Sequence, residues 1–244
     1  MTGKPQGRDI ALIQLLPNAM TLGAICAGVT AMRMALTGRF DLAVAYLILA
    51  AILDGLDGRL ARALRSESLL GAELDSLADI VNFGVAPAII LYFWTQGDAS
   101  VLGWASALVY IICCALRLAR FNVSSKSDVI SDRRFFTGVP APAGAMLALA
   151  PLVLAHAFPD VGVPPAWATA AWLTFAAGLM VCHLPTFSTK FKIPTSFAKL
   201  ALVILAAAIV ALTAYPWQTL LLFDLIYLAS IPFASVVSGA ARVG

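Results

Sequence analysis

The sequence predicts an all-α polytopic membrane protein, and two properties of the chain lead to this fold class. Of its 244 residues, 61% are hydrophobic and only 12% are charged, whereas soluble domains carry about 25% charged residues. Apolar runs of roughly 20 residues, the length that a helix needs to cross the hydrocarbon core, recur along the chain. Neither a single anchor nor a cleaved signal peptide explains this repetition, so we expect one integral membrane domain over residues 1–244.

About eight transmembrane helices are expected from these apolar runs. They cover residues 18–37, 40–63, 71–96, 101–122, 138–157, 165–183, 197–214 and 218–239. Before the first of them, residues 8–16 are expected to form an amphipathic helix that lies along the membrane surface. This interfacial helix should end at Pro17, because proline lacks the N–H that a helix interior requires.

The distribution of Lys and Arg predicts the orientation of these helices. With eight helices both termini lie on one side, and only Arg33 and Arg39 fall on the opposite side. The side of the termini collects Lys4, Arg8, Arg59, Arg62, Arg65, Lys126, Arg133, Arg134, Lys190, Lys192, Lys199 and Arg242. Because cytoplasmic loops are enriched in Lys and Arg, we expect both termini in the cytoplasm and the protein in a bacterial-type inner membrane.

Four aspartates interrupt the second and third predicted helices. Asp54 and Asp57 are three residues apart, and Asp75 and Asp79 are four apart, so each pair lies on one face of its helix. Asp54 lies about 20 Å along its helix from Asp41, which begins that helix near the opposite membrane surface. Since the third helix re-enters from the cytoplasmic side, we expect the four carboxyl groups close together near the cytoplasmic surface.

Each acid costs about 2.5–3.5 kcal/mol to insert into a membrane even singly, so either several of the four are protonated or cations neutralise them. Hard divalent cations prefer oxygen ligands, and the sequence around the aspartates offers no His or Cys that would favour zinc. We therefore expect two divalent ions that would also hold phosphate oxygens. The alternative is that the acids pair with Arg59, Arg62 and Arg65, which follow on the second helix.

Small residues beside the acids leave room for a ligand. Gly58 and Ala61 remove side-chain bulk next to Asp57, so that a planar or phosphorylated group can approach the helix backbone. Arg62, one turn after Gly58, offers a fixed positive charge to a phosphate. Gly71 would keep the neighbouring helix close.

The spacing of these residues resembles the signature of the CDP-alcohol phosphotransferases. From Asp54 to Asp79 the chain reads Asp-x2-Asp-Gly-x2-Ala-Arg-x8-Gly-x3-Asp-x3-Asp, and every fixed position is present. Members of this family are integral membrane enzymes that transfer a phosphoryl-linked group from a CDP-alcohol to a second alcohol and release CMP. The resemblance implies a catalytic core over 18–145, preceded by a cytoplasmic or interfacial N-terminus (1–17) and followed by additional transmembrane helices (146–244).

The resemblance also implies roles for the four acids. Asp54, Asp57, Asp75 and Asp79 would bind the two divalent ions, usually Mg²⁺ or Mn²⁺. Asp79 would in addition be the catalytic general base that accepts the proton of the attacking hydroxyl. The family resemblance further suggests that the protein is a homodimer.

A second set of residues is implied to contact the CDP group. It comprises Gly58, Arg62 and Ser68, together with Asn18 and Thr21 from the segment "PNAMT". Helix capping after Pro17 is the alternative role for Asn18 and Thr21.

Three stretches resemble the members of the family that use L-serine as the acceptor and CDP-diacylglycerol as the donor. They are "GAELDSLADIVNFGVAPA", "ALRLARFNV" and "FTGVPAPAGA". Arg117, Arg120 and Asn122, at the cytoplasmic end of the fourth helix, are expected to bind serine or a lipid phosphate. The alternative is that the two arginines extend to the membrane interface without binding a ligand.

Other functions remain open from the sequence. Family members that make phosphatidylglycerophosphate, phosphatidylinositol phosphate or phosphatidylcholine are the nearest alternatives, although an acceptor that carries its own phosphate calls for more basic residues. A divalent-cation transporter is a remote alternative, since its acids would be distributed across the depth of the membrane instead of clustering on one side.

Overall fold

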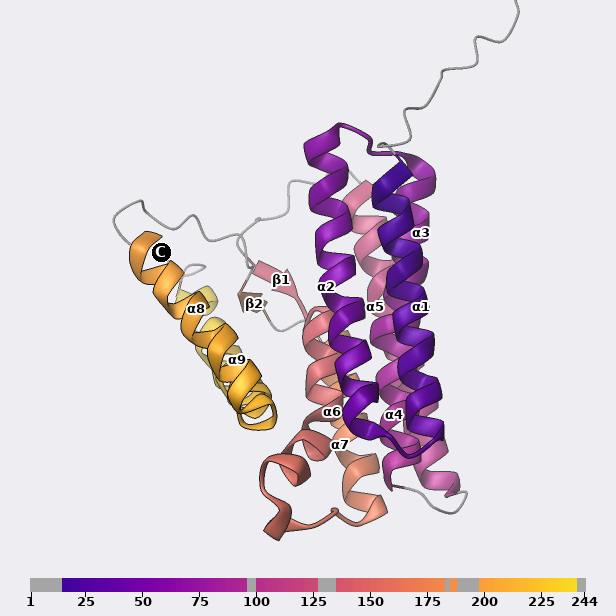
Figure 1. Ribbon diagram of the computed structural model, residues 1–244, viewed down its shortest axis with the longest axis vertical. Coiled ribbons are helices and arrows are strands. Elements are labelled where there is room, and N and C mark those ends of the chain that lie inside the picture. The colour runs from indigo at the N-terminus through magenta and orange to yellow at the C-terminus, as the bar shows by residue number, and fades with distance from the viewer. Residues whose placement is uncertain (1–14, 96–99, 127–134, 183–184, 188–197, 241–244) are drawn as a thin grey trace, which may run out of the picture. The chain divides into compact units, whose positions relative to one another are not determined.

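The computed structural model describes residues 15–95, 100–126, 135–182, 185–187 and 198–240. Helices dominate this part of the chain, which confirms the all-α fold class (Figure 1). The chain divides into two compact units, one up to Asn82 and one from Phe83 onwards, and each unit is described by itself.

The first unit contains three helices, α1 (Leu16–Leu36), α2 (Phe40–Leu64) and α3 (Leu69–Asp79). They lie side by side in Figure 1. The small residues Ala24, Gly28 and Ala31 form a buried face of α1, and small side chains of this kind allow membrane helices to approach closely.

The predicted interfacial helix over 8–16 lies, except for its last two residues, outside the described residues. Its predicted end at Pro17 is wrong, because α1 already begins at Leu16 and Pro17 lies within its first turn. Proline is well tolerated there, since the first N–H groups of a helix have no partner within the helix.

Backbone and side-chain hydrogen bonds stabilise the short turn between α2 and α3. Arg65 has a left-handed conformation with φ 51°, and the N–H groups of Arg65 and Ser66 donate to the carbonyls of Arg62 and Ala61. Ser68 then caps α3, because its hydroxyl accepts the N–H of Gly71 at 3.0 Å. This link sets the point at which the chain re-enters the bundle.

The predicted third membrane helix is one continuous helical segment, Leu69–Thr95, with an irregularity that was not predicted. A π-helical turn, Ile80–Val85, separates α3 from α4 (Ala86–Thr95). In the second unit, the buried hydroxyl of Tyr110 donates to the carbonyl of Phe83 in this turn at 3.0 Å. Irregular turns of this type are frequent at functional sites.

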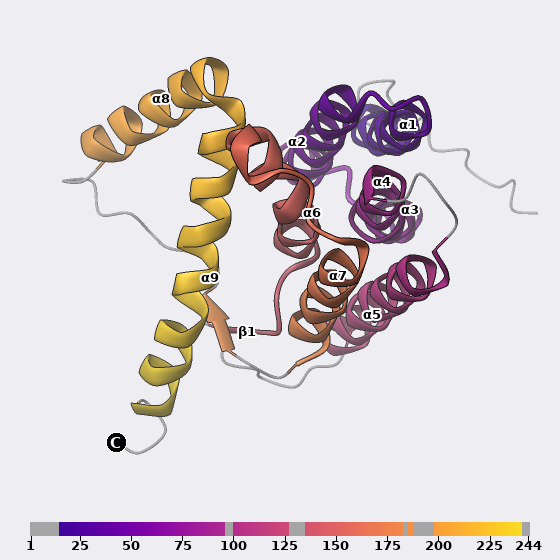
Figure 2. The ribbon, with the colours of Figure 1, turned by 90° about the horizontal axis from the view of Figure 1, so that it is seen from below.

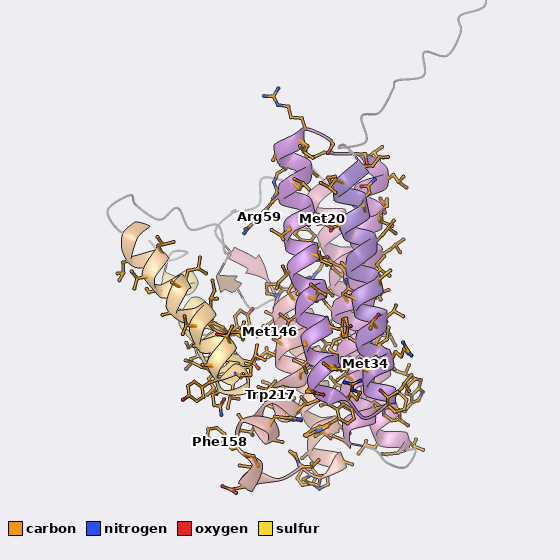
Figure 3. The ribbon with its side chains drawn as sticks, viewed as in Figure 1. Met20, Met34, Arg59, Met146, Phe158 and Trp217 are labelled. Carbon is orange, nitrogen blue, oxygen red and sulfur yellow. The ribbon has the colours of Figure 1, made fainter. Side chains whose placement is uncertain are left out.

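The second unit contains α4, α5 (Val101–Lys126), α6 (Ala141–Ala157), a 3₁₀ turn (Pro159–Val161), α7 (Ala166–Val181), α8 (Ala198–Ala214) and α9 (Pro216–Ala240). In Figure 2, α7 lies between α5 and α6, and α9 lies on the other side of α6. Two short strands, β1 (Phe135–Thr137) and β2 (Pro185–Phe187), pair in antiparallel register and were not predicted. In Figure 3, Trp217 stands at the start of α9 and Phe158 just beyond the end of α6. The Trp217 ring contacts His156 with their centroids 4.4 Å apart.

Helices occur at each of the eight predicted positions, but they differ in how clearly they qualify as membrane spans. Within the described residues, Leu16–Leu36, Leu69–Thr95 and Val101–Val123 are long and apolar enough to cross a membrane. Ala141–Ala157, Ala166–Val181 and Leu200–Ala214 are apolar but shorter. The protein is thus an integral membrane protein, and the count of eight spans stays a prediction.

Helix α6 contains a proline whose effect on the backbone is compensated by α7. Pro151 lacks an N–H, so the carbonyl of Leu147, four residues earlier, loses its helical partner. The indole N–H of Trp172 on α7 donates to this carbonyl at 2.6 Å. The side-chain bond therefore fixes α7 against α6 at the proline.

We expect Trp172→Phe to destabilise the protein by about 1–3 kcal/mol, because the buried Leu147 carbonyl would be left without a donor. The measurement is thermal unfolding of the purified protein in detergent. Trp167→Phe on the same helix is the matched control, since Trp167 is 67% exposed. Equal unfolding temperatures for the two variants would contradict the proposed role of the indole bond.

Candidate active site

The four predicted acids come together in the first unit. Asp54 and Asp57 lie on α2, Asp75 lies on α3, and Asp79 is the last residue of α3. The side chain of Asp54 is within hydrogen-bonding reach of Asp79, and Asp54 is close enough to Asp57 and Asp75 to be repelled by both. Asp57 and Asp75 repel each other in turn. The two helices therefore gather the carboxyl groups as their spacing predicts.

Asp57 is the most enclosed of the four acids, with 3% of its surface exposed. Its Oδ2 accepts a hydrogen bond from the hydroxyl of Thr21 on α1 at 2.5 Å. Its Oδ1 accepts the backbone N–H of Gly58 at 2.5 Å. Both oxygens are thus held, and the carboxyl group has a defined orientation.

Two of the residues expected to contact CDP, Asn18 and Ser68, meet beside Gly71 at the N-terminus of α3. A Cβ atom added at Gly71 would lie 3.0 Å from Oδ1 of Asn18 and 3.1 Å from Oγ of Ser68. The residue before α1 is Leu15, which contributes no side-chain cap. The capping alternative for Asn18 and Thr21 is therefore wrong: Asn18 packs beside α3 and Thr21 beside α2.

Gly58 leaves open space along α2. The nearest atom to an added Cβ would be Nη1 of Arg62, 3.7 Å away. Arg59, Arg62 and Arg65 are all exposed at this end of α2. In Figure 3, Arg59 lies at the level of Met20 on α1, at the opposite end of that helix from Met34. The acids therefore share this end of the unit with basic side chains.

The donor chemistry of the cluster fits a hard divalent cation. All four side chains offer only carboxylate oxygens, which Mg²⁺ and Mn²⁺ prefer, and Oδ1 of Asp54 is buried with no hydrogen-bond partner among the described residues. Within the described ranges, no group of three or more His, Cys, Asp or Glu side chains is set to hold a metal ion as it stands. Gathering the oxygens around an ion would require side-chain movements, and the ion would relieve the repulsion between the acids.

The residues expected to bind serine or a lipid phosphate, Arg117, Arg120 and Asn122, lie on α5 in the second unit. All three are half-buried. Nη1 of Arg120 donates to the carbonyl of Val181, the last residue of α7, at 3.1 Å. A cation at the C-terminus of a helix is favourable because the last carbonyls carry partial negative charge. Arg120 thus has a structural contact in addition to its predicted role.

Two buried polar residues were not predicted as parts of a site. Asn82 is 0% exposed, three residues after Asp79, and neither atom of its amide has a hydrogen-bond partner among the described residues. Its position less than one helical turn after Asp79, inside an apolar run, is the only sequence signal. Asp224 on α9 is 3% exposed, and its Oδ2 has no partner within the described chain. No sequence motif connects Asp224 to the cluster.

Comparisons with known proteins agree with this geometry. The model of the family described as CDP-alcohol phosphatidyltransferase matches residues 14–184, and a second model, CDP-alcohol phosphatidyltransferase 2, matches residues 199–232. Similar proteins from Mycobacterium leprae and Mycobacterium tuberculosis are each named CDP-diacylglycerol–serine O-phosphatidyltransferase. Each is 40% identical over 96% of this chain, and the match covers 79% and 82% of their respective lengths.

A Helicobacter pylori protein with the same name is 42% identical over 55% of this chain and 56% of its own length. The first family model spans the four acids and the residues expected to contact CDP. Since that model covers more than half of the chain and the mycobacterial relatives align with nearly all of it, the chain belongs to the CDP-alcohol phosphatidyltransferase family.

Proposed function

We propose that the protein transfers the phosphatidyl group of CDP-diacylglycerol to the hydroxyl of L-serine, with phosphatidylserine and CMP as products. The observation that carries this proposal is the 40% identity, over 96% of the chain, to relatives named for this reaction. The convergence of Asp54, Asp57, Asp75 and Asp79 supports it, because displacement at a pyrophosphate needs concentrated charge at one point. Cation transport as the main function is not supported, because the relatives are named as transferases.

In the proposed reaction, Asp79 accepts the proton of the serine hydroxyl. The serine oxygen forms a bond to the phosphorus that carries diacylglycerol, and the bond from this phosphorus to CMP breaks. Arg62 and the open backbone at Gly58 bind the phosphates of the donor. Asn18 and Ser68, which meet beside Gly71, contact the rest of the CDP group.

Members of this family generally depend on a divalent metal ion. We propose that Asp54, Asp57, Asp75 and Asp79 hold two such ions, Mg²⁺ or Mn²⁺. When bound, they would neutralise the pyrophosphate and stabilise the charge that develops on CMP as it leaves. The carboxyl groups would hold the ions in place, while Arg62 orients the phosphates of the donor toward the acceptor.

The remaining parts of the proposal concern the membrane and the acceptor. The excess of Lys and Arg on one side supports a cytoplasmic active site and cytoplasmic termini. The helices at the eight predicted positions support eight spans. Arg117, Arg120 and Asn122 would bind serine through its carboxylate. As the family resemblance implies, we propose a homodimer.

An acceptor panel tests the proposed reaction. Purified full-length protein in detergent receives CDP-diacylglycerol, Mn²⁺ or Mg²⁺, and labelled serine, glycerol 3-phosphate, inositol phosphate or choline. We expect lipid-extractable label from serine alone, with one CMP released for each lipid formed. Label from a different acceptor would overturn the choice of serine, and absence of CMP release with all four would overturn the transferase itself.

A further inference from the structure

We infer that Thr21 is a positioning residue for Asp57, and that its hydroxyl holds this carboxyl group in the orientation that metal binding needs. The inference rests on the proposed function for its catalytic consequence. It assigns Thr21 a role different from the nucleotide contact that the family resemblance implies. Thr21 would act through Asp57 and would touch neither substrate.

The geometry of the hydrogen bond leads to this role. Thr21 and Asp57 are each 3% exposed, and their side-chain oxygens are 2.5 Å apart. Thr21 Oγ1 also lies 3.1 Å from the carbonyl of Pro17, but a hydroxyl has one proton. The carboxylate is the stronger acceptor and is closer, so the proton points to Asp57.

The second oxygen of Asp57 is also held by a hydrogen bond, so the orientation of the carboxyl group is fixed. Oδ1 accepts the N–H of Gly58, so the carboxyl group is fixed at both ends and cannot rotate without the loss of a hydrogen bond. A carboxylate has about four acceptor positions, and these two bonds leave the others for a cation. Groups that orient a metal ligand in this way typically contribute about 10–100-fold to metal affinity or activity.

A nucleotide contact is a poorer explanation for Thr21. Its side chain is enclosed between α1 and α2, and its one proton is already donated to Asp57. Asn18, one turn earlier on α1, is half-exposed beside Ser68 and Gly71. Asn18 therefore remains a candidate for CDP contact, whereas Thr21 is not exposed to such a ligand.

Three variants separate orientation from packing. Thr21→Val keeps the shape of the side chain but removes the hydroxyl, and Thr21→Ser keeps the hydroxyl. Thr30→Val is the matched control, because Thr30 lies on the same helix and its hydroxyl donates to the carbonyl of Cys26, four residues earlier, and to no carboxyl group among the described residues. All three are made in the full-length protein.

The primary measurement is Mn²⁺ binding by electron paramagnetic resonance in detergent without lipid substrate. We expect Thr21→Val to weaken Mn²⁺ binding by about 10–100-fold, with Thr21→Ser and Thr30→Val close to the unmodified protein. In a CMP-release assay at saturating Mn²⁺, the KM for CDP-diacylglycerol should be unchanged in Thr21→Val.

Each other result contradicts the inference in a distinct way. A raised KM for CDP-diacylglycerol with unchanged Mn²⁺ binding would restore the nucleotide contact, and equal losses in Thr21→Val and Thr21→Ser would indicate packing. Unchanged binding in every variant, or no Mn²⁺ binding by the unmodified protein, would also overturn it. If the unmodified protein binds Mn²⁺ but transfers nothing to serine, the proposed function fails, while weakened binding in Thr21→Val alone would still support the positioning role.

Discussion

Replacing Asp79 by asparagine is expected to lower kcat for phosphatidyl transfer by at least about 10²–10⁴-fold, the range that a general base contributes. The amide keeps the shape of the side chain but cannot take the proton of the attacking hydroxyl. It also removes one of the three carboxyl groups that surround Asp54. The measurement is the rate of CMP release with serine and CDP-diacylglycerol at saturating Mn²⁺.

The same substitution should not destabilise the metal-free protein, because it removes repulsion between Asp79 and Asp54. Loss of activity together with unchanged or raised thermal stability would therefore separate a catalytic role from a structural one. Asp41→Asn is the matched control, since Asp41 is an exposed acid in the first turn of α2, away from the cluster. An Asp79→Asn protein as active as Asp41→Asn would exclude Asp79 as the base.

The cluster of four aspartates could be predicted because it depends on residues that are close together in the sequence. Spacings of three and four residues place Asp54 with Asp57, and Asp75 with Asp79, on single helix faces. A short link forces the two helices to be antiparallel neighbours. The helix positions could be predicted for a similar reason, since the length of each apolar run in the sequence indicates the length of its helix. Their ends in the structure lie within a few residues of the predicted ends.

The hydrogen bonds between helices could not be predicted, because they join residues that are far apart in the sequence. Thr21 and Asp57 are 36 residues apart, and Arg120 and Val181 are 61 apart. Hydropathy indicates that a side chain is within an apolar helix, but it does not identify the helix that this side chain faces. The π-helical turn after Asp79 likewise has no distinctive pattern, since its residues "IVNFGV" also suit a regular helix.

Replacing Gly28 by alanine is expected to lower both stability and activity, because Gly28 of α1 packs directly against the buried side chain of Asn82. A Cβ atom added at Gly28 would collide with Oδ1 of Asn82 and lie 3.1 Å from its Cγ. Asn82 is 0% exposed, so its amide cannot move aside into solvent. We expect Gly28→Ala to cost about 1–3 kcal/mol of stability, as overpacking in a well-packed interior does.

We expect Gly28→Ala to lower kcat by more than its loss of stability alone explains. Asn82 follows Asp79 by less than one helical turn, so a displacement of Asn82 from α1 also moves Asp79 relative to the acids of α2. A misplacement of about 1 Å can cost about 10²-fold in rate. Thermal unfolding and kcat are to be measured together, at a temperature where the variant is folded.

Gly23→Ala on the same helix is the matched control for Gly28→Ala. Its added Cβ would lie 3.6 Å from Cδ1 of Leu53, an ordinary contact, and alanine is favoured over glycine within a helix by about 1 kcal/mol. The pair Gly28→Ala and Asn82→Ala should show positive coupling, because removal of the amide creates the space that the new methyl group needs. If Gly28→Ala were as stable and active as Gly23→Ala, or if the double variant recovered nothing, the contact between Gly28 and Asn82 would not position Asp79. If the double variant regained stability but not activity, the amide of Asn82 would itself be required at the site, beyond its packing against α1.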